Sequence, residues 1–169
     1  MEEIFIESLG KIRKLKRRIE KSLGVKLTLT KDKVTIESEK GDAFSEYIGE
    51  KILDALNLGF DFKEAMQLKN EEFMLEKISI KRFARPTRLR QILGRIIGKK
   101  GKAIKTLSLL TDCSIAVSDY TVALIGRTED VDVALLAVMK MIRGSPHAKV
   151  YGFLERQKAL KREAENLEL

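Results

Sequence analysis

The sequence predicts an α+β protein built from two copies of one βααββα unit, packed together. Two observations predict this class: helical and alternating apolar spacings follow one another in that order, and the chain resembles itself when shifted by 88 residues. Over that shift Gly10 falls on Gly98 and Lys11 falls on Lys99, without a gap. The matching apolar pairs are Ile19/Leu107, Leu27/Ile115, Leu29/Val117, Val34/Val122 and Ile36/Leu124. The self-match indicates a duplicated supersecondary unit.

The second copy shows every element of the unit. Alternating residues over 76–83 predict its first strand, which Arg85-Pro86-Thr87 ends. Two helices follow from apolar residues at helical spacing, namely Leu89, Ile92, Leu93, Ile96 and Ile97, then Ala103, Ile104, Leu107 and Leu110. Two further strands are expected over 113–118 and 122–125. Thr128 is expected to cap a last helix over 131–142, which Gly144 ends.

Between the two predicted helices lies Gly98-Lys99-Lys100-Gly101. Glycine has no Cβ, so the backbone turns sharply here and comes close to a ligand. The turn leads into a helix start, whose unpaired N–H groups favour phosphate, and the lysines add positive charge. The segment is not a Walker P-loop, because Gly94 is not followed by Gly-Lys-Ser or Gly-Lys-Thr at the required spacing. It predicts a turn that holds a nucleic-acid backbone.

The first copy is degenerate. Its turn reads Gly10-Lys11-Ile12-Arg13, so Arg13 replaces the second glycine, and too few residues precede it for a full first helix. We expect a short strand over Ile4–Ile6 and a shortened or missing first helix, although one continuous helix over 2–23 also fits the apolar spacing. The later elements are expected as strands over 25–30 and 33–37 and helices over 42–57 and 62–68. The predicted domains are therefore 1–72 and 73–155, followed by a charged helical tail over 156–169.

Basic residues gather in the second half of the chain. Residues 1–75 hold 14 Lys and Arg against 15 Asp and Glu, whereas residues 76–169 hold 19 against 10. From Lys77 to Thr111 there are eleven basic residues and no acidic one. Because ordinary surfaces intersperse the two signs, this stretch favours a polyanionic partner over its alternative, a solvated face. In the first copy a basic cluster over 11–26 leaves two interpretations open, a supporting pseudo-domain and a second RNA contact.

The composition excludes several classes of site. A single cysteine, Cys113, excludes an intrachain disulfide and a cysteine-based zinc site, and the single histidine, His147, has no clustered catalytic partner. No apolar run reaches the ~18 residues that suggest a membrane span. We expect a soluble cytoplasmic protein with no cofactor, no metal and no enzymatic activity.

The glycine turn between two helices resembles that of the KH RNA-binding domain, and the order βααββα resembles its type I fold. The ends of the two copies narrow the resemblance. These are Leu58-Gly59-Phe60 with Ala65 and Leu68, then Arg143-Gly144-Ser145-Pro146-His147 with Val150-Tyr151 and Leu154-Glu155-Arg156. They resemble the archaeal double-KH proteins of the Krr/Dim/partner-of-Nob ribosome-assembly family.

That resemblance implies an RNA-binding factor of ribosome biogenesis. It implies binding of single-stranded small-subunit (pre-)rRNA near its 3′ end, with a PIN-domain rRNA endonuclease and the alpha subunit of initiation factor two as further partners. The implied RNA-binding residues are Gly94, Arg95, Ile97, Gly98, Lys99, Lys100, Gly101, Lys102, Ile104 and Lys105. Additional RNA contacts are expected at Arg88, Arg90, Arg143, Ser145 and His147. The alternatives are another KH factor, associated with the exosome or with transcription, and a basic scaffold for an acidic protein.

Overall fold

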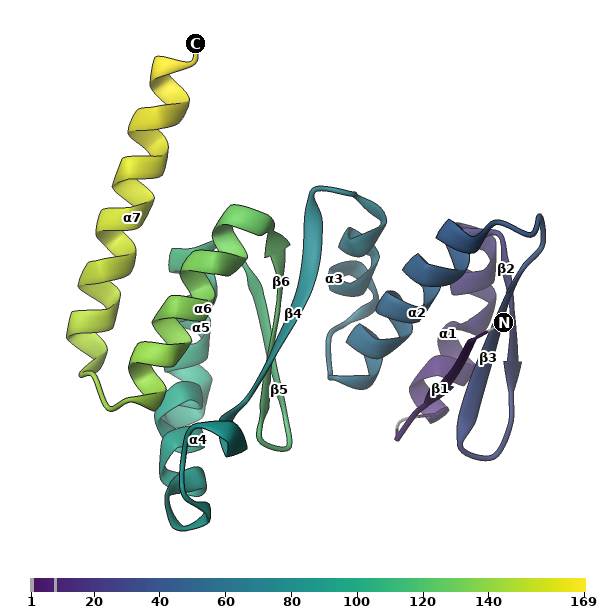
Figure 1. The fold of residues 1–169 in the computed structure, drawn as a ribbon, viewed down its shortest axis with the longest axis horizontal. Helices are drawn as coiled ribbons and strands as arrows, with labels where there is room; N and C mark the ends of the chain where they lie inside the picture. Colours follow the sequence, from purple (N-terminus) through teal and green to yellow (C-terminus); the bar gives the residue numbers. More distant parts are fainter. Residues whose placement is uncertain (1, 8) are drawn as a thin grey trace. The chain divides into compact units, whose positions relative to one another are not determined.

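The computed structural model describes residues 2–7 and 9–169, and the chain divides into two compact units. Unit 1 is Met1–Glu71 and unit 2 is Glu72–Leu169 (Figure 1). Each unit contains one three-stranded antiparallel sheet with helices on one face. The predicted α+β class is therefore confirmed.

Unit 2 has the predicted order βααββα, followed by one more helix. Its elements are β4 (Phe73–Ser79), α4 (Leu89–Ile97), α5 (Lys102–Thr111), β5 (Ser114–Ser118), β6 (Thr121–Arg127), α6 (Thr128–Ile142) and α7 (His147–Leu167). The strands lie in the order β4-β6-β5, so the last strand of the chain occupies the centre. Buried Leu107, Leu124 and Val138 join the helices to the sheet in one core. The predicted tail beyond residue 155 continues α7 to Leu167.

Two predicted boundaries in unit 2 are shifted. The first strand begins at Phe73, because its register on β6 runs from Phe73 opposite Arg127, and it ends at Ser79, where a 3-10 turn starts. Thr128 is the first residue of α6 rather than its cap. Arg127 takes the cap position with extended backbone and without a side-chain hydrogen bond.

Unit 1 lacks the first helix of the pattern, as expected. Its elements are β1 (Glu2–Phe5), α1 (Leu9–Leu23), β2 (Val25–Leu29), β3 (Lys33–Ser38), α2 (Ala43–Asn57) and α3 (Phe62–Met66). The alternative of one helix from residue 2 is wrong, since Glu2–Phe5 pairs with β3. The predicted degenerate turn is also wrong, because residues 10–13 lie inside α1. Buried Ile12 and Ile19 hold α1 on the sheet along its whole length.

The strand registers measure how much shorter unit 1 is than unit 2. Leu27 faces Ile36 in unit 1, and Ile115 faces Leu124 in unit 2, so β2 and β3 match their counterparts at the offset of 88 residues. The first strand matches at an offset of only 74, because Glu2 faces Ile36 where Glu76 faces Leu124. Unit 1 is therefore 14 residues shorter between its first strand and the following helix, which removes the counterpart of α4.

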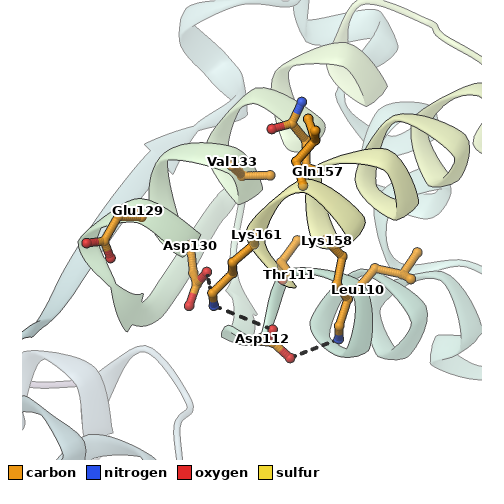
Figure 2. A pocket seen from close by; sticks show the side chains of 10 residues that line it. Leu110, Thr111, Asp112, Glu129, Asp130, Val133, Gln157, Lys158 and Lys161 are labelled. Carbon is orange, nitrogen blue, oxygen red and sulfur yellow. Dashed lines mark hydrogen bonds and ion pairs between the residues drawn. The ribbon is translucent and has the colours of Figure 1, made fainter. Parts of the chain in front are cut away.

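Helix α7 is fixed to unit 2 by an apolar and an ionic contact. Val150 and Leu154 are buried in the core. Farther along, Lys161 Nζ lies 2.8 Å from Asp130 Oδ1, and Lys158 Nζ lies 3.0 Å from Asp112 Oδ1. Figure 2 shows the two lysines reaching across a cavity of about 310 Å³ toward these carboxylates. The hydrogen bond from Lys161 to Asp130 raises the pKa of the lysine.

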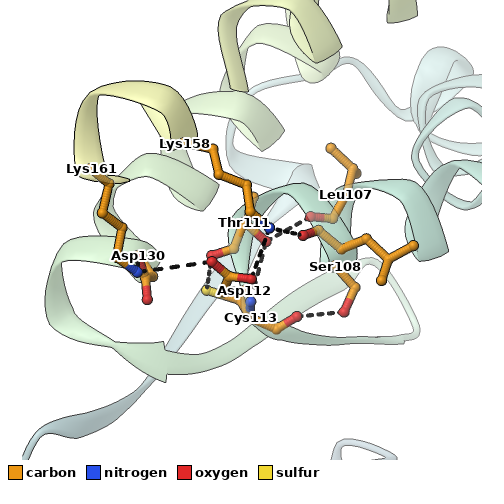
Figure 3. A network of polar contacts seen from close by, with 9 residues as sticks. Leu107, Ser108, Thr111, Asp112, Cys113, Asp130, Lys158 and Lys161 are labelled. Atoms are coloured by element: carbon orange, nitrogen blue, oxygen red, sulfur yellow. Dashed lines mark hydrogen bonds and ion pairs between the residues drawn. The ribbon is translucent and has the colours of Figure 1, made fainter. Parts of the chain in front are cut away.

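Beneath this ionic contact the end of α5 is fixed to β5 through side-chain hydroxyls. Ser108 Oγ donates to Cys113 O at 2.5 Å, and Thr111 Oγ1 donates to Leu107 O at 2.7 Å (Figure 3). The Cys113 thiol is buried below them, and this burial raises its pKa to about 12. Among the described residues, no helix has the length and apolar character needed to cross a membrane.

Candidate nucleic-acid interface

The turn between α4 and α5 exists because an amphipathic helix ends in glycine. Leu89, Ile92 and Ile96 bury one face of α4. At its end Gly98 adopts φ +73°, and its N–H donates to Gly94 O at 2.8 Å. A left-handed residue in this place satisfies a free carbonyl of the last turn and reverses the chain. The sequence therefore stops α4 and starts α5 within four residues.

Close approach of the backbone makes glycine necessary at position 98. A Cβ atom there would lie 2.6 Å from Ala103 Cβ and 2.7 Å from Ala103 N. The small side chain of Ala103 is equally needed, since it lies at the same contact. Gly101 is constrained differently: it has space for a Cβ but adopts φ +73°, which L side chains rarely do. Together these contacts press the turn against the start of α5 and leave its outer side open.

The lysines of the turn are exposed and unpaired. Lys99, Lys100, Lys102 and Lys105 are all exposed, and none of them forms an ion pair with a described residue. Lys100 adopts φ +54°, a left-handed conformation that is uncommon for a residue with a side chain. Four ammonium groups without a carboxylate within reach make this the kind of surface that attracts phosphates.

Apolar side chains border the lysines. Ile97 ends α4 and Ile104 lies in the first turn of α5, and both are half-buried. All five residues of β5, Ser114–Ser118, are also half-buried. The predicted site residues from Gly94 to Lys105 are thus brought together on one turn and the two helix ends that flank it.

Arg95 differs from the other predicted residues because its guanidinium is already engaged. Nη1 donates to Met141 O at 3.3 Å and Nη2 donates to Ser145 O at 2.5 Å, at the end of α6. In return, His147 Nε2 lies 2.8 Å from Arg95 O. A carbonyl oxygen only accepts, so this nitrogen carries the hydrogen. We call this arrangement of Arg95, Ser145 and His147 the clasp; it fixes the end of α4, directly before the turn, to the α6–α7 connection.

The additional predicted contacts separate into two groups. Ser145 and His147 belong to the clasp, whereas Arg88, Arg90 and Arg143 are exposed. The sequence did not reveal two features of the site. One is the requirement for a small residue at Ala103, which looks like any other core position. The other is the set of backbone acceptors for Arg95, which no residue type marks.

Comparison with known proteins agrees with this geometry. The family model for the second KH domain of PNO1, described as a eukaryotic-type KH domain (KH-domain type I), matches residues 74–159. A KH domain-containing protein of Methanocaldococcus jannaschii is 38% identical over 154 residues, which are 89% of this chain and 68% of that protein. The chain belongs to the PNO1/Dim2 family of KH-domain proteins.

Other members of this family carry functional names. A pre-rRNA-processing protein pno1 of Aspergillus oryzae is 33% identical over 112 residues, which are 64% of this chain and 43% of that protein. This chain therefore spans less than half of that relative's length. The aDim2p structure from Pyrococcus horikoshii, solved as a complex with a/eIF2alpha and rRNA, has a TM-score of 0.84 and 32% identity, covering 94% of this chain and 93% of that one.

Proposed function

We propose that this PNO1/Dim2 protein is a cytoplasmic RNA-binding factor of ribosome biogenesis. It binds small-subunit (pre-)rRNA near its 3′ end through unit 2 and assists the maturation of that RNA. The observation that carries the proposal is the open turn Gly98–Gly101, with exposed and unpaired lysines beside the half-buried Ile97 and Ile104. The names of its relatives, a pre-rRNA-processing protein and a Dim2 protein in complex with rRNA, support the choice of RNA.

The proposed mode of binding places phosphates over the turn and bases against its apolar border. KH domains clamp about four nucleotides of a single strand with such a turn. Lys99 and Lys100 would bind phosphate oxygens, and the glycines keep side chains out of the strand's way. Ile97, Ile104 and the outer face of β5 would contact the bases. The few aromatic residues near the turn make apolar and hydrogen-bonded contacts, rather than ring stacking, the means of reading sequence.

The protein acts by binding rather than by catalysis in this proposal. Its one histidine, His147, is part of the clasp, and its one thiol, Cys113, is buried with a raised pKa. The initiation factor present in the Pyrococcus complex supports the alpha subunit of initiation factor two as a partner. A PIN-domain endonuclease that cleaves the bound rRNA is the further partner that the proposal includes.

Replacement of the two lysines of the turn tests the proposal. Lys99→Ala with Lys100→Ala is expected to weaken binding of a small-subunit rRNA 3′ oligonucleotide roughly tenfold or more, because two charge-assisted hydrogen bonds to phosphate can no longer form. The slope of log K against log salt should become about 1.4 smaller, at ~0.7 per phosphate on a single strand. Fluorescence anisotropy over a salt series measures both.

A matched control keeps the comparison fair. Lys31→Ala with Lys40→Ala removes the same charge from exposed lysines of unit 1. If the variant of the turn binds the rRNA oligonucleotide no more weakly than this control, the turn is not the RNA site. An oligonucleotide of equal length and scrambled sequence separates the proposed function from the alternative of a general KH factor, since equal affinity for both would favour the latter.

A further inference from the structure

A second cluster of cations surrounds a cavity of about 170 Å³ between α6 and α7. No residue of the turn Gly98–Gly101 lines it. Its lining residues are Lys140, Ser145, Lys149, Val150, Phe153 and Arg156. We call it the α6–α7 cavity. Three of these six side chains carry a positive charge and none carries a negative charge.

The cations of the α6–α7 cavity have no counter-charge in the protein. Lys140, Lys149 and Arg156 are exposed, and none of them forms an ion pair with a described residue. The surrounding chain offers none either, because residues 133–154 contain no Asp or Glu. Drawing like charges together costs free energy that an anion would offset. The positions of these three cations thus favour an anionic ligand.

Regular elements hold the groups around the cavity in place. Lys140 Nζ lies 5.0 Å from the centre of the Phe153 ring, a cation–π contact that keeps the ammonium beside the cavity. The Arg156 guanidinium folds back along α7 to Gly152, with Nη1 3.5 Å from where a Cβ would stand. Ser145 is fixed through its carbonyl by Arg95, and its hydroxyl bonds to no described residue. That hydroxyl is available as a donor among the cations.

We propose that the α6–α7 cavity binds a backbone phosphate of RNA, at a site separate from the turn Gly98–Gly101. Small-molecule pockets usually measure about 300–1,000 Å³, so a cavity of this size suits a phosphate group better than a whole nucleoside. An arginine, two lysines and a hydroxyl are typical phosphate donors. The inference rests on the proposed function in one respect only, namely that RNA supplies the phosphate.

Removal of the three cations tests the inference. Lys140→Ala, Lys149→Ala and Arg156→Ala together are compared with Lys31→Ala, Lys40→Ala and Lys63→Ala, three exposed lysines of unit 1. With an rRNA 3′ oligonucleotide long enough to extend beyond the turn, we expect the cavity variant to bind roughly tenfold more weakly than its control. We also expect its salt slope to fall by about 0.7 for each RNA phosphate that the variant no longer binds.

The outcomes separate this inference from the proposed function. If the variant of the turn loses RNA while the cavity variant matches its control in affinity and salt slope, the cavity is not an RNA site and the proposed function stands. If neither variant loses RNA, both fail. Loss of polyglutamate binding with RNA binding intact would also overturn the inference, because it would assign the cavity to an acidic protein.

A second variant guards against a folding artefact. Ser145→Glu places a carboxylate among the three cations and leaves the backbone carbonyl that Arg95 needs. We expect thermal stability equal to or above that of the wild type and weaker RNA binding, because the new charge fills the phosphate's place. Unchanged RNA affinity in this stably folded variant would contradict the inference.

Discussion

Lys11 and Arg95 hold equivalent carbonyl oxygens in the two units. Lys11 Nζ donates to Leu56 O and Phe60 O, and Arg95 donates to Met141 O and Ser145 O. Both acceptor pairs end the last helix over the sheet and match at an offset of 85 residues. Gly59 and Gly144, which also match, have φ +108° and +97°. Since a cation neutralises the free carbonyls of a helix end, the contact is a structural device that unit 1 retains without the first helix of the pattern.

Arg95→Met is expected to destabilise unit 2. The methionine keeps an unbranched apolar stem but leaves two carbonyls without their charged donor, which costs roughly 1.5–3 kcal/mol. Urea unfolding measures the loss, and Arg90→Met, on an exposed position of the same helix, is the control. Equal stability of the two variants would show that the clasp contributes nothing. Arg95→Lys should recover part of the loss, because Lys11 makes the same contact in unit 1.

Gly98→Ala is expected to distort the turn and weaken RNA binding at least as much as loss of the lysines does. Its Cβ would meet Ala103 at 2.6 Å, and the backbone nitrogen of Ala103 at 2.7 Å cannot be relieved by changing that side chain. Anisotropy with the rRNA oligonucleotide and a thermal melt measure the two effects.

Gly94→Ala provides the matched control for this change. Position 94 lies in α4 with nothing within 4 Å of a new Cβ, so alanine should raise stability by up to about 1 kcal/mol through helix propensity. If Gly98→Ala behaves like Gly94→Ala in stability and RNA affinity, the close approach of the backbone is unimportant.

The sequence predicted unit 2 well because each of its elements is long enough to display its own spacing. The stripe of α4 and the glycines of the turn each have a local physical cause, so they could be recognised without tertiary information. The clasp could not be predicted in the same way. Its acceptors, Met141 O and Ser145 O, are backbone atoms that every residue carries, and they become available only when α6 ends beside α4.

Unit 1 shows how tertiary packing overrides a local signal. Gly10 and Arg13 align with the glycines of the turn, which predicted a degenerate turn there. A single exposed glycine costs a helix only about 1 kcal/mol, however, and burial of Ile12 and Ile19 contributes more than that. With 14 residues missing, β1 leads into one continuous helix. The residue match was real, but its conformation depended on residues that are absent.

Lys161→Met is expected to loosen the outer half of α7. Asp130 is nearly buried and would lose its hydrogen-bonded partner, at a cost of about 1 kcal/mol for this partly exposed pair. Hydrogen exchange should therefore become faster in α7 beyond Lys158 and stay unchanged in α4 and the turn. Arg162→Met, at the next and exposed position, is the control. Identical exchange in both variants would show that the ion pair does not hold the helix.

Cys113→Ala is expected to remove part of the loss of stability at alkaline pH. Burial raises the pKa of the Cys113 thiol to about 12 from an ordinary value of 9.0, so above pH 9 the unfolded chain releases a proton that the folded chain retains. The folded state then loses about 1.4 kcal/mol per pH unit until the thiol ionises in the folded state near pH 12. Lysines titrate in the same range, so the measurement is the difference in urea unfolding free energy between wild type and variant from pH 8 to 11. Alanine leaves a small cavity, which lowers stability by the same amount at every pH, so the expected signature is a difference that shrinks as pH rises. A difference that stays constant would contradict the prediction and would mean that the thiol becomes solvated before the protein unfolds.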